Sequence, residues 1–340
     1  MDRAVVERDP HLARGCSACH KGDGRASDKQ AAHAGLVKRP SDDVRVCGEC
    51  HDTIAGTYRT SLHYTTAGLK HGALPRFGPA EAKQFAERVF PASCASCHAS
   101  CGECHVKAPT VAGVGTGLVS GHRFVRRNEG RTCAACHGGR VYPEFTGEYG
   151  GMPDVHYEKG MMCIDCHSAA EMHGDGTSYT SRREVKSRPS CAKCHPPGSE
   201  KTPKASAAHQ RHASTVSCVA CHAATPYRNC SECHLGRGAT ARPDFVLGAS
   251  PRDPTRVTTL RRVPTVKGTF DPAGLGLAAF DAAPNYWDTV PHNIRKRTDR
   301  TRSCDVCHVE RRGFLTRETL PQDGSRANEA LVRVPRQIKE

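Results

Sequence analysis

Hydrophobic and polar positions repeat with a helical period over one stretch, residues 79–90, which reads PAEAKQFAERVF. Apolar residues recur there every three or four positions and predict a stripe on one helix face. Pro79 suits the first turn because its missing N–H needs no partner there. We therefore expect a helix over 79–90 with its stripe packed into a core. The stripe residues are Ala82, Phe85, Ala86 and Val89.

Two further helices are predicted at residues 52–63 (DTIAGTYRTSLH) and 202–215 (TPKASAAHQRHAST). The chain contains 32 Gly and 22 Pro, so long regular elements should be few and strands scarce. No apolar run reaches the roughly 18 residues that a membrane helix needs. The fold predicted from patterning is therefore mostly irregular, with short α-helices, little β-structure and no transmembrane segment.

The composition argues against an ordinary hydrophobic core. Only 37% of the 340 residues are hydrophobic and only 5% aromatic, and the first figure includes 20 cysteines. A chain of this composition buries too little apolar side chain to fold as a conventional globule. We infer that something other than protein fills its centre.

Every cysteine falls into one pattern, C-x-x-C-H, which occurs ten times with none left over. The cysteines are Cys16, Cys19, Cys47, Cys50, Cys94, Cys97, Cys101, Cys104, Cys133, Cys136, Cys163, Cys166, Cys191, Cys194, Cys218, Cys221, Cys230, Cys233, Cys304 and Cys307. The motif histidines are His20, His51, His98, His105, His137, His167, His195, His222, His234 and His308.

This pattern is the attachment signature of c-type haem. Two thiols three positions apart share a face of a helical turn and can add to both vinyl groups of one porphyrin, while the following His ligates the iron. A lone C-x-x-C also occurs in zinc and redox sites, but those do not need the His. Only one residue in 17 is His, so ten occurrences in ten are not chance. The sequence predicts ten covalently attached haems stacked as the core.

Ten histidines lie outside the motifs, which equals the number of sixth ligands that ten bis-histidine irons need. They are His11, His33, His63, His71, His122, His156, His173, His209, His212 and His292. His209 and His212 share a helix face and could serve two neighbouring haems, and in a filament His11 could ligate a haem of a neighbouring subunit. Met161, Met162 and Met172 are alternative axial ligands, but gap-filling in the core is the expected role.

The formal charge of +14 first suggests a nucleic-acid partner. Ten haems, however, add roughly −20 from propionates and about +10 from ferric centres, which leaves the oxidised holoprotein near +4. Arginines such as those in RKRTDRTR (295–302) are therefore expected to pair with propionates. No nucleic-acid partner is predicted.

The spacing of the motifs predicts three segments. Residues 1–90 form an N-terminal dihaem segment, and residues 91–235 form a haem-dense core with seven motifs, most of which start 27 to 32 residues apart. Residues 236–340 contain a Pro-rich stretch and one last motif. Because residues 235–303 hold no motif and many prolines, we expect an extended arm over the haem core.

The chain resembles a decahaem cytochrome c. Four of its segments also resemble the octahaem tetrathionate reductase family, which is related to hydroxylamine oxidoreductase. These segments are CASCHASCGECHVKAP, SGHRF, PDVHYEKGMMCIDCHSAAEMHGDGT and VPHNIRKRTDRTRSCDVCH. The resemblance covers about residues 90–310. It implies distal ligation by His122, His156, His173 and His292. Reductases of that family keep one haem open, often at a CxxCK motif, and this chain has no CxxCK.

The predicted function is therefore electron transfer through ten bis-histidine haems rather than catalysis. Expected partners are other redox proteins or a terminal extracellular acceptor, and a homopolymeric cytochrome filament is a related prediction. The alternative is a reductase of small nitrogen or sulfur oxyanions. Thioether attachment takes place outside the cytoplasm, so a periplasmic or extracellular location is expected, although the N-terminus (MDRAVVERDPHLARG) shows no secretory signal.

Overall fold

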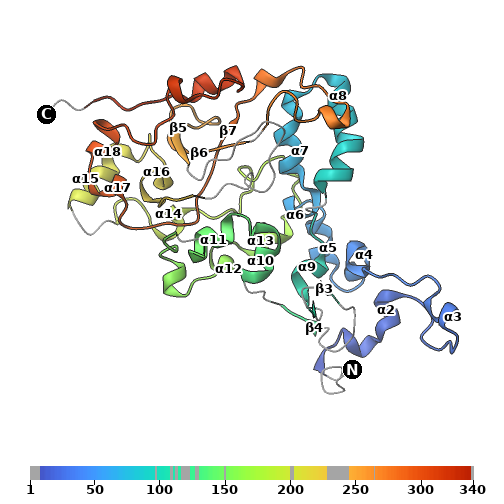
Figure 1. The fold of residues 1–340 in the computed structure, drawn as a ribbon. Helices are drawn as coiled ribbons and strands as arrows, with labels where there is room; N and C mark the ends of the chain where they lie inside the picture. The colour runs from blue at the N-terminus through green and yellow to red at the C-terminus, as the bar shows by residue number, and fades with distance from the viewer. Residues whose placement is uncertain are drawn as a thin grey trace. The chain divides into compact units, whose positions relative to one another are not determined.

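Short helical turns joined by irregular chain make up most of the structure, a computed structural model that describes residues 8–95, 98–107, 110–111, 114–115, 123–126, 130–148, 151–199, 203–227, 245–263 and 265–337 (Figure 1). The chain divides into two units. Unit 1 comprises residues 1–68, 95–132 and 167–188, and unit 2 comprises residues 69–94, 133–166 and 189–340. The three predicted segments stay a prediction.

Unit 1 is built from short helices and two-residue strands. The helices are η1 (Leu12–Arg14), α2 (Cys16–His20), α3 (Lys29–His33), η2 (Pro40–Asp42), α4 (Val44–Gly48), α5 (Asp52–Tyr58), α6 (Leu62–Thr65), α9 (Cys101–His105) and α13 (Ala169–His173). The strands pair antiparallel as β1 (Val106–Lys107) with β4 (Arg123–Phe124) and β2 (Thr110–Val111) with β3 (Val114–Gly115). The unit boundary falls within α7 (Ala67–Ala73) and within α10 (Gly130–His137).

Local caps and a very small core hold unit 1 together. Its hydrophobic cluster consists of Val44, Ala55 and Tyr58. Asp43 caps α4 by accepting from the backbone N–H of Arg45 at 3.0 Å. Such caps satisfy backbone donors that a short helix leaves unpaired. The predicted helix at 52–63 is confirmed as α5 followed by α6.

Unit 2 begins with η3 (Leu74–Arg76) and the predicted helix at 79–90, which forms as α8 (Pro79–Gln84) and continues as the π-helix η4 (Phe85–Cys94). Pro79 lies in the first turn as expected. Phe85 is 1% exposed and stacks on Phe77 with ring centroids 4.8 Å apart. The prediction of an inward apolar stripe is confirmed.

The remaining helices of unit 2 are also short. They are α11 (Val141–Thr146), η6 (Tyr157–Lys159), α12 (Cys163–Cys166), α14 (Cys191–Cys194), α15 (Pro203–His212), α16 (Cys218–His222), η8 (Asp271–Ala273), η9 (Phe280–Ala282), α17 (Asp299–Arg302), α18 (Asp305–His308), η10 (Arg317–Thr319) and η11 (Arg326–Leu331). The predicted helix at 202–215 is confirmed as α15. Among the residues described, none of the helices combines the length and apolar character needed to cross a bilayer.

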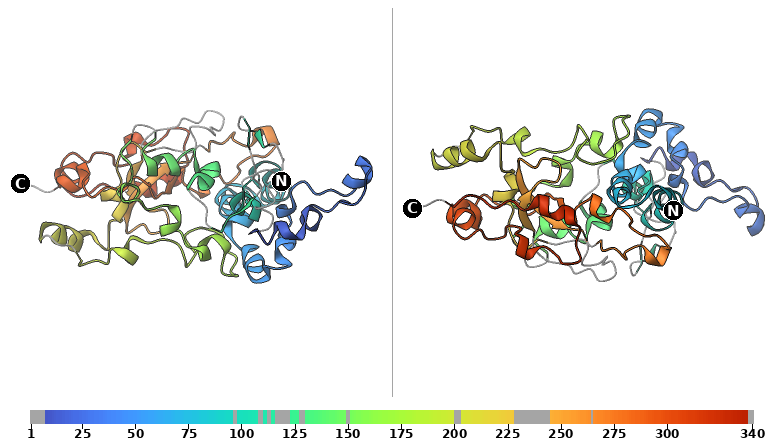
Figure 2. Two further views of the ribbon diagram at one scale, coloured as in Figure 1. Left: turned by 90° about the horizontal axis from the view of Figure 1, so that it is seen from below. Right: turned by 90° about the horizontal axis from the view of Figure 1, so that it is seen from above.

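The extended arm expected at residues 235–303 is wrong for the part that the structure describes. An antiparallel sheet forms there, in the order β5 (Val246–Ala249), β6 (Val257–Arg262) and β7 (Tyr286–Asp288). Leu260 pairs with Val246 on one side and with Asp288 on the other. Figure 2 shows the C-terminal chain, in red, running along these strands, where η11 contacts β5. The prolines lie in the connections, so they do not prevent strand pairing.

Two hydrophobic clusters cover this sheet. One contains Leu260, Tyr286, Leu315 and Leu331, and the other joins Val219, Ala220, Ala223 and Tyr227 of the α16 region to Phe245, Leu247 and Phe314. A buried hydrogen-bond network of Asn285, Ser325 and Asn328, which we call the polar clasp, lies beside them. Asn285 donates from its backbone N–H to Asn328 Oδ1 at 2.7 Å, and its own Oδ1 accepts from the Ser325 N–H at 2.6 Å. This part of unit 2 therefore has a protein core of its own.

Candidate haem-binding sites

Helical turns carry most of the described attachment cysteines, as the spacing predicted, while Cys50 and Cys304 lie just outside α4 and α18. Motif cysteines lie in α2, α4, η4, α9, α10, α12, α14, α16 and α18. Within a turn, residues three apart face the same side, which is the arrangement that two thioether bonds to one porphyrin require. Cys97, Cys230, Cys233 and His234, and the distal candidate His122, lie outside the described residues.

The Nδ1 atoms of several motif histidines bond to backbone carbonyls. The pairs are His20 with Val37 (2.8 Å), His98 with Tyr64 (2.6 Å), His105 with Val125 (2.8 Å), His222 with Arg295 (3.1 Å) and His308 with Arg336 (3.0 Å). A carbonyl oxygen can only accept, so Nδ1 carries the proton and Nε2 keeps its lone pair. This second partner fixes ring orientation in the way that metal-ligating histidines require.

Histidines outside the motifs show the same tautomer. Their Nδ1 partners are Asp9 for His11 (2.9 Å), Lys29 O for His33 (2.7 Å), Asp154 for His156 (2.7 Å) and Ala208 O for His212 (2.8 Å). Burial lowers the pKa of His63 and of His173, which favours the neutral imidazole. These rings are therefore in the form that binds iron through Nε2.

The structure brings motif and non-motif rings together in pairs. Centroid separations are 6.0 Å for His51 and His11, 5.9 Å for His105 and His173, 6.1 Å for His195 and His156, 6.1 Å for His222 and His209, and 6.2 Å for His308 and His212. Metal–imidazole bonds are about 2 Å long, and a ring centroid lies about 1 Å behind its nitrogen, so opposed ligands of one ion have centroids about 6 Å apart. The centroid separation of each pair matches that expected for two ligands of one iron.

Two sequence expectations concern these rings. His209 and His212 both lie on α15 and face two different motif histidines, as predicted. His11, a candidate ligand for a neighbouring subunit, faces His51 of its own chain and stacks on Phe124 at 4.1 Å. Its ring thus lies beside the second motif of its own chain, and ligation of a haem in a neighbouring subunit stays a prediction.

The other candidate ligands have defined places. His63 lies within electrostatic range of the motif histidine His167. His33 and His71 are exposed on α3 and α7, and His292 is half-buried, with its backbone N–H donating to Glu144 at 3.0 Å. Met161, Met162 and Met172 are half-buried, and their gap-filling role stays a prediction.

Cysteines of motifs far apart in sequence lie beside one another. The thiols of Cys47 and Cys101 hydrogen-bond in unit 1, and those of Cys191 and Cys218 do so in unit 2. Each cysteine would be bonded to the rim of its porphyrin. Contact between two such sulfurs therefore places two porphyrin edges together.

Two further cysteine pairs extend this neighbourhood within unit 2. Cys166 lies within electrostatic range of Cys194, and Cys221 lies within range of Cys307, which packs on the hydrophobic cluster of α16. Together with the Cys191–Cys218 contact, these pairs order four helices as α12, α14, α16 and α18. We call them the four-helix row, and Figure 1 shows them following one another in that order.

Sequence reasoning missed the charged groups around these sites. Buried Asp154 holds the Nδ1 of His156, and Glu171 holds that of His167 at 2.9 Å. Their spacings offered a signal, since an Asp two residues before a His and a Glu four residues after one can both reach its ring.

Arginines take two roles near the row. Arg256 Nε is buried without a hydrogen-bond partner among the described residues, and its charge acts on the Cys218 thiol. An unused guanidinium donor there fits a haem propionate. Arg300 differs from the expectation that the 295–302 arginines pair with propionates, because it donates through Nε to Ala220 O at 2.6 Å and also through Nη2 to Ala223 O.

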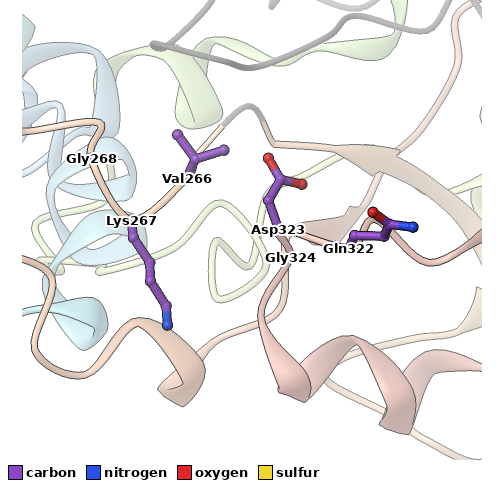
Figure 3. Close-up of a pocket in the computed structure, with 6 residues that line it drawn as sticks. All are labelled: Val266, Lys267, Gly268, Gln322, Asp323 and Gly324. Atoms are coloured by element: carbon purple, nitrogen blue, oxygen red, sulfur yellow. The ribbon is translucent and has the colours of Figure 1, made fainter.

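The pocket in Figure 3 is separate from this chemistry. Its volume is about 340 Å³, and it is lined by Val266, Lys267, Gly268, Gln322, Asp323 and Gly324. Asp323 forms an ion pair with Arg262 at 3.4 Å, and the Lys267 side chain points away from it. The lining includes neither a cysteine nor a histidine, so it offers no haem site.

Comparison with known families gives one match. The family described as Cytochrome c554 and c-prime matches residues 168–223, which contain the motifs that begin at Cys191 and Cys218. Searches of curated proteins and of solved structures find no significant match.

The match and the fold agree with each other. The described chain is mostly helical and irregular with little sheet, as expected for a multihaem c-type cytochrome, and the predicted fold class is confirmed. The match supports covalently bound haem c and a role in electron transfer for the stretch that it covers. The resemblance to the octahaem reductases stays a prediction.

Proposed function

We propose that the chain relays electrons through ten c-type haems, one at each C-x-x-C-H motif, with two histidines on every iron. The supporting observation is the set of five ring pairs, each with one motif and one non-motif histidine, at 5.9 to 6.2 Å between centroids. Rings that only filled space would have no reason to pair in this way at one distance.

Bis-histidine ligation suits a relay. When bound, haem supplies a one-electron iron couple, and two imidazoles keep that iron six-coordinate in both oxidation states. The protein contributes the spacing, and the cysteine contacts at Cys47–Cys101 and Cys191–Cys218 bring attachment sites together. Closely spaced edges favour electron transfer between neighbouring sites.

Mass spectrometry and ligand binding test the proposal. The mature holoprotein should carry ten haem adducts, and the dithionite-reduced protein should bind no carbon monoxide. His212→Ala should open one site, giving one equivalent of bound carbon monoxide and one high-spin ferric signal. His212→Met should close that site again, because thioether is also an axial ligand.

Lys204 provides the matched control, since it lies exposed on the same helix as His212. Lys204→Ala should leave all spectra unchanged. A mature protein with fewer adducts, or wild-type protein that binds carbon monoxide, contradicts the proposal. The latter result would instead support the alternative function, a reductase of small nitrogen or sulfur oxyanions, which needs an open iron.

The location and partners follow from the same chemistry. Thioether attachment outside the cytoplasm supports a periplasmic or extracellular protein that exchanges electrons with other redox proteins or an extracellular acceptor. The filament is a weaker extension, because His11 faces His51 within its own chain. Electron micrographs of the purified holoprotein test it, since only monodisperse particles under all conditions would count against a polymer.

A further inference from the structure

The four-helix row carries opposite charges at its two ends. Asp154 lies at the α12–α14 end, within electrostatic range of Cys166. Arg300 lies at the α16–α18 end, where its charge acts on both Cys221 and Cys307. Because a ferric haem bears one more positive charge than a ferrous haem, a fixed charge beside it shifts its reduction potential.

Three hydrogen bonds hold the buried carboxylate of Asp154 in place. It is 3% exposed, its Oδ1 accepts from the backbone N–H and the Nδ1–H of His156 at 2.8 and 2.7 Å, and its Oδ2 accepts from the Ile294 N–H at 2.8 Å. The His156 ring faces His195 of the second motif in the row. A carboxylate on an axial imidazole makes that ligand more basic. Both its charge and this bond stabilise ferric iron and lower the potential.

Arg300 also makes well-defined contacts, at the α16–α18 end of the row. Its guanidinium donates to Ala220 O at 2.6 Å and lies over the Phe245 ring, with Cζ 5.0 Å from the centroid. The motif histidines there, His222 and His308, bond to neutral carbonyls instead of carboxylates. A half-buried positive charge between two attachment sites stabilises ferrous iron and raises both potentials.

We propose that Asp154 and Arg300 polarise the four-helix row, so that electrons move from the haems of α12 and α14 toward those of α16 and α18. This inference rests on the proposed relay. The step balances internally, since a ferrous iron at the Asp154 end is oxidised as a ferric iron at the Arg300 end is reduced. The device needs only two fixed charges, neither of which touches the iron.

Potentiometric titration of the holoprotein, followed by optical and electron paramagnetic resonance spectra, tests the proposal. Asp154→Asn should shift one or two of the ten one-electron steps upward, and Arg300→Gln should shift two steps downward. Arg300→Lys, which keeps the charge, should stay close to wild type. Arg256→Gln removes a second positive charge, beside Cys218, and should lower the potential of one step. This variant tests the proposal even if Arg300→Gln does not fold.

The matched control is Arg326→Gln on η11. Arg326 is 86% exposed and paired with Asp281, so its loss changes net charge equally but should not move any step. Equal shifts in Arg326→Gln and Arg300→Gln, equal shifts in Arg300→Lys and Arg300→Gln, or unchanged steps in Asp154→Asn would each overturn the inference. Failure of the relay itself appears separately, as missing haem adducts or carbon monoxide binding in the wild type.

Discussion

Residues 8–68 and residues 245–337 differ in the number of hydrophobic residues that they bury. The first region carries two motifs and buries only Val44, Ala55 and Tyr58 among its hydrophobic residues. The second carries one motif and buries a far larger set: Phe245, Leu247, Ala249, Leu260, Leu275, Leu277, Phe280, Tyr286, Val306, Phe314, Leu315 and Leu331. The protein core grows where the motifs become sparse.

The difference indicates what porphyrins do for the fold. A segment with a motif every thirty residues cannot bury enough of its own side chains to offset its loss of chain entropy. Under the proposed function, bound porphyrin would supply the missing apolar surface there. A segment with one motif, such as residues 245–337, has to supply the surface itself.

The largest effect should come from removing haem altogether. We expect the full-length chain, expressed without haem attachment, to lose protection from proteases at residues 8–68 by at least roughly tenfold relative to residues 245–337, because local stability follows buried contacts. Limited proteolysis with peptide mapping measures both regions in one sample. Equal protection in both regions would show that haem does not set the difference.

A smaller effect should follow from damage to the core of the sheet. Leu260→Ala in the holoprotein should lower the free energy of unfolding by about 2–5 kcal/mol, since Leu260 is fully buried. Trp287 in β7 is the only tryptophan and reports on this sheet through fluorescence.

Val44→Ala provides the comparison in the motif-rich region. It should cost about 1–2 kcal/mol, because fewer methyl groups are lost. The haem absorption band follows unfolding of that region, so chemical denaturation can be read at both places. A larger cost for Val44→Ala than for Leu260→Ala would reverse the comparison.

The sequence was most informative about local features. C-x-x-C-H spacing placed most of the described cysteines on helical turns, and apolar periodicity located α8. These features depend on residues within a few positions of one another. The number of histidines outside the motifs also predicted one distal partner for each motif histidine, but it did not predict which rings would pair.

Features that depend on distant contacts could not be read in this way. His212 and His308 are brought together only by the fold of unit 2. The sheet of β5, β6 and β7 was missed because its strands are short and separated by proline-rich connections, which outweighed their apolar residues in the prediction. The sequence could not place Asp154 and Arg300 at opposite ends of the four-helix row, because the order of the motifs in space depends on the fold.

The polar clasp beside the sheet gives a third, more local test. Asn285→Ala removes the acceptor for the Ser325 N–H and the donor to Thr265 O at 2.6 Å. Leaving buried partners unsatisfied costs about 1–3 kcal/mol, which should appear as an earlier Trp287 transition with unchanged haem bands. A double variant with Asn328→Ala should cost less than the sum of the single variants, because both side chains belong to one network. Simple additivity would show that they act independently.

The smallest effect should appear at the cap of α4 in the motif-rich region, where local contacts replace a core. Hydrogen bonds from Arg45 lower the pKa of Asp43 to about 2. The stabilisation by this carboxylate is therefore complete above its ordinary pKa near 4 and is lost as the pH falls toward about 2. Asp43→Asn, which keeps a capping side chain, should flatten the acid dependence of helical circular dichroism in that window. Arg45→Gln should move the same loss to higher pH, and an unchanged acid titration in both variants would assign no role to this pair.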